Sequence, residues 1–269
     1  MSFKRIFAIF VRQIFLIKSN PTRLVSIFLW IIISIVQWGF ISKYLGSFGN
    51  ATFNFINVIL GAIIIWEFTA RIQQGILTSF LEDVWAKNFI NYFSSPLKVS
   101  EYIAGLVLTS LTMGLIGFVF MFLIAWLAFS YNVFQLGFLI LLFLLILFIF
   151  GVAMGIFVAG LVFRLGPAAE WLSWPIPLVL SIFSGVFYPI SVLPASLQLL
   201  AKILPSSYVF ESIRGVISQG IFYPPLGFNL IVGTVLALIY LGLAYLFFTK
   251  IYRHNLKEGN IARFSAESL

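Results

Sequence analysis

The sequence predicts an all-α integral membrane protein, and three features predict it. Hydrophobic residues make up 62% of the 269 positions and charged residues only 9%. Soluble domains carry about 25% charged residues, so this composition cannot supply a water-facing surface. Six apolar stretches each approach or exceed the roughly 20 residues that a helix needs to cross about 30 Å of hydrocarbon. Most positive charges lie at the ends of these stretches, and the length fits one membrane domain.

The residue types exclude most enzyme classes. The chain has no Cys and a single His, His254, so disulfides, thiolate chemistry and a zinc site are excluded. No Gly-rich loop ending in Lys-Ser or Lys-Thr occurs, so ATP binding by a Walker motif is excluded. We therefore expect a chain that is not an enzyme and holds no metal or cofactor. The net charge of +8 forms no basic module, which indicates contact with anionic lipid head groups and no nucleic-acid partner.

Residues 3–18 are predicted to form an amphipathic helix, within an N-terminal unit of residues 1–22. Apolar residues recur at spacings of three or four, while the charged residues fall mostly outside that stripe; the apolar set is Phe3, Phe7, Phe10, Ile14 and Ile17. This pattern is typical of a helix lying in the membrane interface. The alternative is a cytosolic tail that continues into the first span. Pro21 disfavours helical geometry at Asn20, where we expect the helix to end.

Six spans follow within a transmembrane domain of residues 23–252. They are predicted at about 24–41, 53–72, 102–129, 134–163, 168–188 and 226–248. A polar tail, 253–269, completes the chain. With the N-terminus inside, thirteen of the 16 Lys and Arg residues fall on the inner side. The excess of positive charge on inner segments then predicts that both termini are cytoplasmic, and six spans give the same result.

The inner connection between the second and third spans, about 73–101, has apolar residues at helical spacing over 80–93. We predict an amphipathic cytoplasmic helix that couples the spans to a soluble partner, followed by a break at Pro96. Its candidate coupling residues are Phe80, Glu82, Asp83, Trp85, Lys87, Phe89 and Pro96. The alternative is a passive interfacial loop.

The outer connection, 189–225, contains apolar pieces between prolines that are each too short to cross a bilayer. Such pieces are typical of re-entrant or interfacial helices, so we predict a hairpin after the fifth span that caps the outer mouth. Glu211 and Arg214 are three residues apart and can pair on one helix face. The candidate gate residues are Pro189, Pro205, Tyr208, Glu211 and Arg214. The alternative is a simple surface hairpin.

Charged residues within spans are costly and often functional. Glu67 and Arg71 are four residues apart, near the inner end of the second span, and therefore lie on one helix face. One interpretation is an ion pair at the membrane interface, and the other is a polar contact that moves during gating. Gly151 and Gly155 allow close helix approach, either within the chain or in a dimer. The spans hold few other ionisable groups, which argues against a proton or sodium carrier.

These elements together resemble the permeases of the ABC-2 transporter family. In that family an interfacial helix precedes six spans, a cytoplasmic coupling helix ends in a Pro-Leu like Pro96-Leu97, and a broken hairpin follows the fifth span. Pro205, Tyr208 and Arg214 match the hairpin's Pro-x-x-Tyr and nearby Arg, and Ser184-Gly185 precedes them. The coupling segment departs from the commonest pattern, because Glu82-Asp83 is followed by Val84-Trp85 rather than by basic and glycine residues.

The resemblance implies the membrane-spanning permease subunit of an ATP-driven exporter in the cell membrane. Two permease chains, most simply a homodimer, would enclose a path, and two separate ABC ATPase subunits, which bind ATP and Mg, would dock at residues 80–93. The cargo implied is a lipid, a glycan or a drug-like molecule, and the sequence does not choose among them. The alternative is a secondary carrier or channel that acts without an ATPase.

Overall fold

The structure is a computed structural model that describes residues 1–19, 21–48, 59–86, 88, 91–92, 95–132, 136–220 and 223–258. All the regular elements in these ranges are helices, which confirms the predicted all-α class for the part of the chain described. The predicted coupling residues Lys87 and Phe89 lie outside the described residues.

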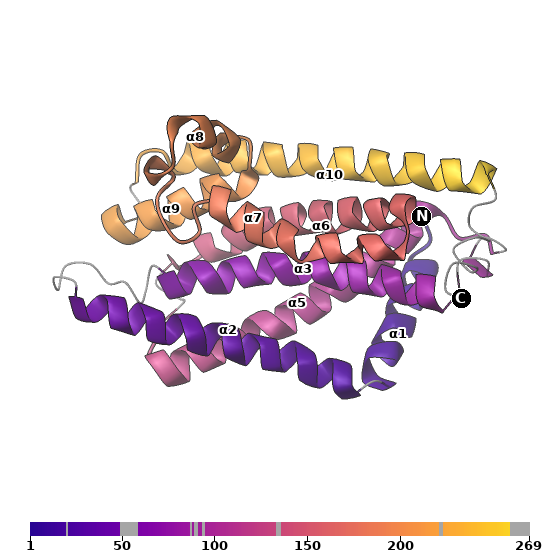
Figure 1. The fold of residues 1–269 in the computed structure, drawn as a ribbon, viewed down its shortest axis with the longest axis horizontal. Coiled ribbons are helices and arrows are strands. Elements are labelled where there is room, and N and C mark those ends of the chain that lie inside the picture. The colour runs from indigo at the N-terminus through magenta and orange to yellow at the C-terminus, as the bar shows by residue number, and fades with distance from the viewer. Residues whose placement is uncertain are drawn as a thin grey trace.

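Long helices run side by side; the first four alternate in direction, and the last runs parallel to the fourth (Figure 1). They are α2 (Pro21–Phe48), α3 (Gly61–Trp85), α5 (Val99–Phe129), α6 (Leu139–Leu165) and α10 (Leu226–Lys257). The start of α1 (Phe3–Ser19) and the end of α10 lie at one end of the bundle, with α1 lying across it. We call this the α1 end. The helices α8 (Ala195–Lys202) and α9 (Pro205–Gln219) lie at the opposite end, which we call the hairpin end.

Four described helices are long and apolar enough to cross a membrane: α2 over Phe28–Ser47, α5, α6 and α10. They correspond to four of the predicted spans. The predicted second span falls on α3, which does not meet this measure because Glu67, Arg71, Gln73 and Gln74 interrupt its apolar residues. The six-span topology therefore stays a prediction.

The predicted fifth span, 168–188, is not one continuous α-helix. It consists of the 3-10 helix η3 (Pro167–Ser173) and the short helix α7 (Pro175–Phe183). Pro175 stands at the first position of α7, which suits the start of a new helix and not the interior of an existing one. A short 3-10 helix, η4 (Ile190–Val192), then leads into α8.

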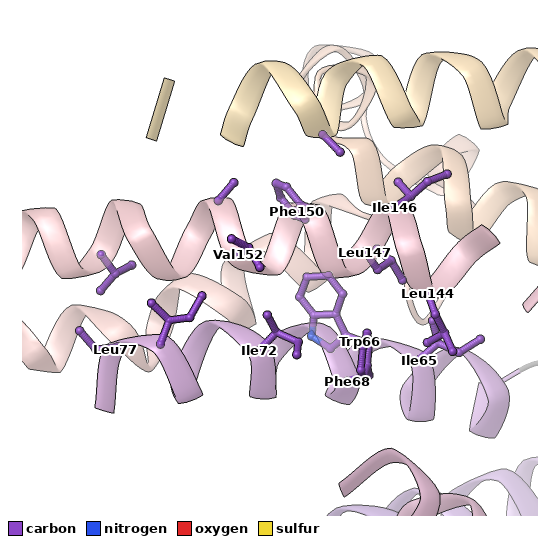
Figure 2. Packing of buried hydrophobic residues seen from close by; sticks show 14 of the residues in the cluster. Ile65, Trp66, Phe68, Ile72, Leu77, Leu144, Ile146, Leu147, Phe150 and Val152 are labelled. Carbon is purple, nitrogen blue, oxygen red and sulfur yellow. The ribbon is translucent and has the colours of Figure 1, made fainter. Parts of the chain in front are cut away.

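The core lies between α3 and α6, where large apolar side chains from both helices meet (Figure 2). Glycines bring the two backbones close: a Cβ placed on Gly151 would lie 2.9 Å from the Thr69 carbonyl oxygen, and one on Gly155 would lie 2.9 Å from Ile76 Cβ. Of the two roles predicted for this Gly pair, the structure therefore uses it for packing within the chain.

Helix α3 continues further than predicted. Residues 61–85 form one helix, so the prediction that a separate helix begins at Phe80 is wrong. The sequence between Ile72 and Trp85 contains no proline, and its polar residues find partners at the α1 end instead of ending the helix. Similarly, α10 extends to Lys257 and includes the first residues of the predicted tail.

Candidate functional site

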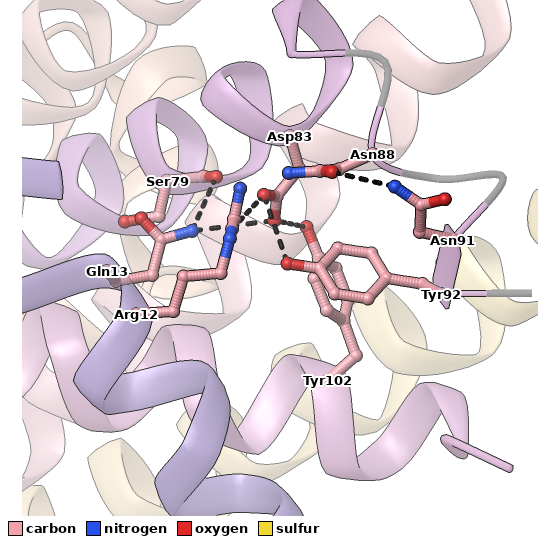
Figure 3. Close-up of polar contacts among 8 residues, drawn as sticks. All are labelled: Arg12, Gln13, Ser79, Asp83, Asn88, Asn91, Tyr92 and Tyr102. Carbon is pink, nitrogen blue, oxygen red and sulfur yellow. Dashed lines mark hydrogen bonds and ion pairs between the residues drawn. The ribbon is translucent and has the colours of Figure 1, made fainter. Parts of the chain in front are cut away.

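The α1 end of α3 carries a buried carboxylate. Asp83, in the last turn of the helix, has a side chain that is 0% exposed. Its oxygens accept hydrogen bonds from the Tyr102 hydroxyl of α5 at 2.7 Å and from the Tyr92 hydroxyl at 3.2 Å, and they form an ion pair with Arg12 of α1 (Figure 3). The Gln13 amide donates to Asp83 at 3.4 Å. We call these five residues the Asp83 cluster.

The chemistry of the Asp83 cluster is complementary. An ionised carboxylate only accepts hydrogen bonds, and every neighbour that it contacts here is a donor. Burial, reinforced by the Asp83 carboxylate, raises the pKa of the Tyr92 phenol, so this group stays protonated and remains a donor. The Arg12 guanidinium also lies over the Tyr92 ring, 5.6 Å from its centroid. Buried charges that are paired and hydrogen-bonded in this way fix the elements that carry them.

A second carboxylate attaches the start of α1. Glu101, in the first turn of α5, has a side chain that is 1% exposed. It accepts hydrogen bonds from the Ser2 backbone amide at 2.7 Å and from the Lys98 amide at 3.0 Å, and pairs with Arg5 at 3.2 Å. A carboxylate in the first turn of a helix also interacts favourably with the helix dipole. Helix α1 is thus held at two places, by α3 through Asp83 and by α5 through Glu101.

The predicted coupling residues divide between buried and exposed positions. Phe80 is fully buried among aromatic rings that include Phe163 and Phe248. Asp83 is buried in its cluster, and Glu82 is half-buried. Trp85 is 55% exposed, and Pro96 is exposed while its carbonyl accepts a hydrogen bond from Arg5. Contact with a partner at Trp85 and Pro96 stays a prediction, whereas Phe80 and Asp83 act inside the chain.

At the hairpin end, the predicted gate residues do come together. The Glu211 carboxylate accepts a hydrogen bond from the Ile190 amide, next to Pro189, at 3.0 Å and pairs with Arg214 at 3.2 Å. Arg214 also donates to the Gly185 carbonyl, where the chain turns back after α7 with a positive φ of 67°. These contacts join the start of the hairpin to α9. The role of this cluster as a gate stays a prediction.

The other two predicted hairpin residues shape its second helix. Pro205 is the first residue of α9, where proline is favoured, and the Tyr208 hydroxyl donates to the Lys202 carbonyl at 2.9 Å. Sequence reasoning missed the buried hydroxyl pair of Ser184 and Ser206, 2.6 Å apart, which ties the end of α7 to α9. Serine is too common in helices and turns for this pair to stand out in the sequence.

Glu67 and Arg71 form the expected ion pair, with 3.3 Å between Arg71 Nη2 and Glu67 Oε2. The Ser34 hydroxyl, midway along α2, donates to Glu67 Oε1 at 3.1 Å. The Arg71 side chain lies against Gly117, in the middle part of α5. The pair therefore lies at mid-height in the bundle, and its predicted position near the inner end of a membrane span stays a prediction.

A comparison with protein families now bears on this geometry. The family model of the ABC-2 type transporter matches residues 4–218. The chain belongs to this family. None of the curated proteins compared with this ABC-2 chain matches it.

Membership of the ABC-2 family establishes the general function of the chain. Proteins of the ABC-2 family are membrane components of transporters, are not themselves catalytic, and generally work with an ABC ATPase partner. This ABC-2 chain is therefore a multi-pass membrane protein and a transporter permease subunit. The matched residues include the Asp83 cluster, the hairpin and the pair at mid-height.

Proposed function

We propose that the chain is the permease subunit of an ATP-driven exporter and that the Asp83 cluster transmits the motion of a separate ATPase to the bundle. The observation that carries the proposal is that one buried carboxylate binds α1, α3, α5 and the connection between α3 and α5 at the same end of the molecule. A force applied at this end reaches several long helices at once.

The distribution of positive charge supports a cytoplasmic α1 end. Lys4, Arg5, Arg12 and Lys18 belong to α1, and Lys250 and Arg253 lie near the end of α10. An excess of Lys and Arg marks the cytoplasmic side of a membrane protein. In this orientation both termini and the α3–α5 connection face the ATPase, and the hairpin faces outward.

We propose the following cycle. Two copies of the chain pair around a path, and two ATPase subunits dock at the exposed residues Trp85 and Pro96. When the ATPase subunits close on ATP, the docked connection moves, and the Asp83 cluster carries α1 and α3 with it. Because α3 is a continuous helix that packs closely against α6, tilting α3 opens the hairpin end. Cargo of lipid, glycan or drug-like character then leaves on the outer side.

The docking surface can be tested with two matched tryptophans. Trp85 is 55% exposed at the α1 end, and Trp126 is 54% exposed near the end of α5 that is furthest from it. Truncating a tryptophan in the centre of an interface costs about 2 kcal/mol or more, roughly a 30-fold loss of affinity. We expect Trp85→Ala to weaken association with a co-expressed ABC ATPase by about this factor, and Trp126→Ala to leave it unchanged. Equal affinities for both variants would refute docking at Trp85.

A secondary carrier is the second candidate, and the position of Glu67 and Arg71 at mid-height favours it. Carriers commonly place ionisable groups near the bilayer midplane. Flux in sealed vesicles separates the two functions. The exporter requires the ATPase and ATP, whereas a carrier moves cargo uphill with an ion gradient and the permease alone.

A further inference from the structure

The half-buried side of α3 is polar, although the helix is packed into a membrane bundle. Seventeen of its 25 residues are buried. Of the others, five are polar and follow one another at intervals of three or four residues: Glu67, Arg71, Gln74, Thr78 and Glu82. Such intervals place these residues on one face of the helix. We call this face the α3 stripe. A side of a helix that faced lipid would instead be apolar.

The α3 stripe begins at the α1 end and stops at mid-height. From Glu67 toward the hairpin end, α3 is buried and apolar through residues such as Ile64 and Ile65. From Glu82 to Glu67 is about 22 Å along the helix axis, at 1.5 Å per residue. The stripe is therefore a line of half-buried polar residues that extends from the α1 end to the Glu67–Arg71 pair.

The hydrogen-bond donors and acceptors at the Glu67–Arg71 pair that have no partner in the described part of the chain indicate which charge a bound ligand would carry. Both Glu67 oxygens already accept a hydrogen bond, from Ser34 and from Arg71. Arg71 has five N–H donors and directs one nitrogen, Nη2, at Glu67, while its buried Nε has no hydrogen-bond partner among the described residues. An unpaired buried donor is unfavourable and is satisfied by an acceptor, best by an anionic one.

Aromatic rings beside the stripe offer a surface for an apolar tail. The Gln74 side chain donates to the Ser173 carbonyl at 3.3 Å, and Trp174 is the next residue. The Trp174 ring lies 6.3 Å from that of Trp30 on α2, and each residue is more than half exposed. Exposed aromatic rings thus lie near Gln74, which is about one helical turn from Arg71.

We propose that the Glu67–Arg71 pair is a binding site for the anionic head group of an amphiphilic cargo, which reaches it along the α3 stripe. The phosphate or carboxylate of the cargo binds the open donors of Arg71, and its chain lies against Trp30 and Trp174. Glu67 occupies Arg71 in the empty site and competes with the cargo. This inference rests on the proposed function, because binding of an amphiphile does not by itself show that the amphiphile is transported.

Accessibility of the stripe can be tested with single cysteines, since the chain has no native Cys. A membrane-impermeant methanethiosulfonate reagent reacts with the thiolate, which forms only in contact with water. Thr78 belongs to the α3 stripe, and Ala70 is a half-buried residue next to Arg71. In nanodiscs that hold the permease alone, we expect Thr78→Cys and Ala70→Cys to react. Leu238→Cys, at a 52% exposed apolar site on α10, is the lipid-facing control and should not react. The proposal would be overturned if Thr78→Cys and Ala70→Cys were labelled as slowly as the control. A second copy of the chain that covered the stripe would give the same slow labelling, and would equally exclude this site.

Binding can be measured in the same system with dodecyl phosphate, using dodecyl maltoside as the uncharged match. We expect dodecyl phosphate to slow labelling of Ala70→Cys about tenfold and the maltoside to leave it unchanged. When Arg71→Met is combined with Ala70→Cys, the concentration of dodecyl phosphate needed for protection should rise at least tenfold. This is the loss expected when hydrogen bonds from a charged group are removed. Glu67→Gln should lower that concentration, because it removes the internal competitor.

Lys43→Met, which removes an exposed cation near the hairpin end of α2, is the charge control and should change nothing. Equal protection by both amphiphiles, or protection that survives Arg71→Met, would refute the site. The assay contains no ATPase and no nucleotide, so its outcome is independent of whether Trp85 docks a partner.

Discussion

The substitution Asp83→Asn tests whether the Asp83 cluster holds α1 in place. The amide keeps the size of the side chain but loses the charge, and its NH₂ group must face donors from Arg12, Tyr92 or Tyr102. Removing one partner of a buried ion pair costs about 3–5 kcal/mol. The Arg12 side chain is 28% exposed, so water recovers part of its solvation, and we take the lower value of about 3 kcal/mol. At 1.4 kcal/mol per factor of ten, the population of detached α1 rises about 100-fold.

The labelling rate of a cysteine at position 9 reports this population. Ile9 is 5% exposed and lies against Gly105 of α5, so a thiol there reacts only when α1 detaches. We expect Asp83→Asn to raise the labelling rate about 100-fold. Glu170→Gln removes a carboxylate at the same end of the bundle that is not part of the cluster, and should leave the rate unchanged. A rate for Asp83→Asn within a factor of two of this control would refute the reasoning.

Two further substitutions test the packing of the bundle and the hairpin. Gly151→Ala places a Cβ 2.9 Å from the Thr69 carbonyl oxygen and should lower the melting temperature in detergent by about 5 °C. The control Gly242→Ala meets no atom within 4 Å and should not lower the melting temperature. Equal melting temperatures for the two variants would contradict close α3–α6 packing. Glu211→Gln weakens the charge-assisted contact with Arg214 and should speed hydrogen exchange at the Ile190 amide about tenfold, and unchanged exchange there would show that Glu211 does not hold the hairpin.

The membrane character of the chain and most of its long helices could be predicted from the sequence because composition and run length determine them. The ranges 102–129 and 226–248 each fall on one long helix, and the range 134–163 corresponds to α6, which begins at Leu139. The errors lie where Pro175 begins a new helix within the predicted fifth span, and where α3 carries polar residues. Helix α3 continues through Gln73, Gln74 and Asp83 because tertiary contacts, which the sequence does not display, satisfy these side chains.

Contacts within one helix were predictable, and contacts between distant segments were not. Glu67 with Arg71 and Glu211 with Arg214 follow from helical spacing alone. Arg12 and Asp83 are 71 residues apart, and only the position of α1 across the end of the bundle brings them together. The available signal was weak: a single Asp within a helix otherwise rich in apolar residues, and basic residues on α1 with no acidic neighbours in sequence.

The most direct test of the central claim measures the opening of the hairpin end when the ATPase is locked with ATP and vanadate. Spin labels at Leu45→Cys, near the hairpin end of α2, and at Val192→Cys, which is 67% exposed in η4, report the distance between these elements by double electron–electron resonance. The account predicts a longer distance in the trapped complex, and no lengthening when Asp83→Asn is added although the ATPase remains bound. Full lengthening in the Asp83→Asn complex would contradict transmission through Asp83.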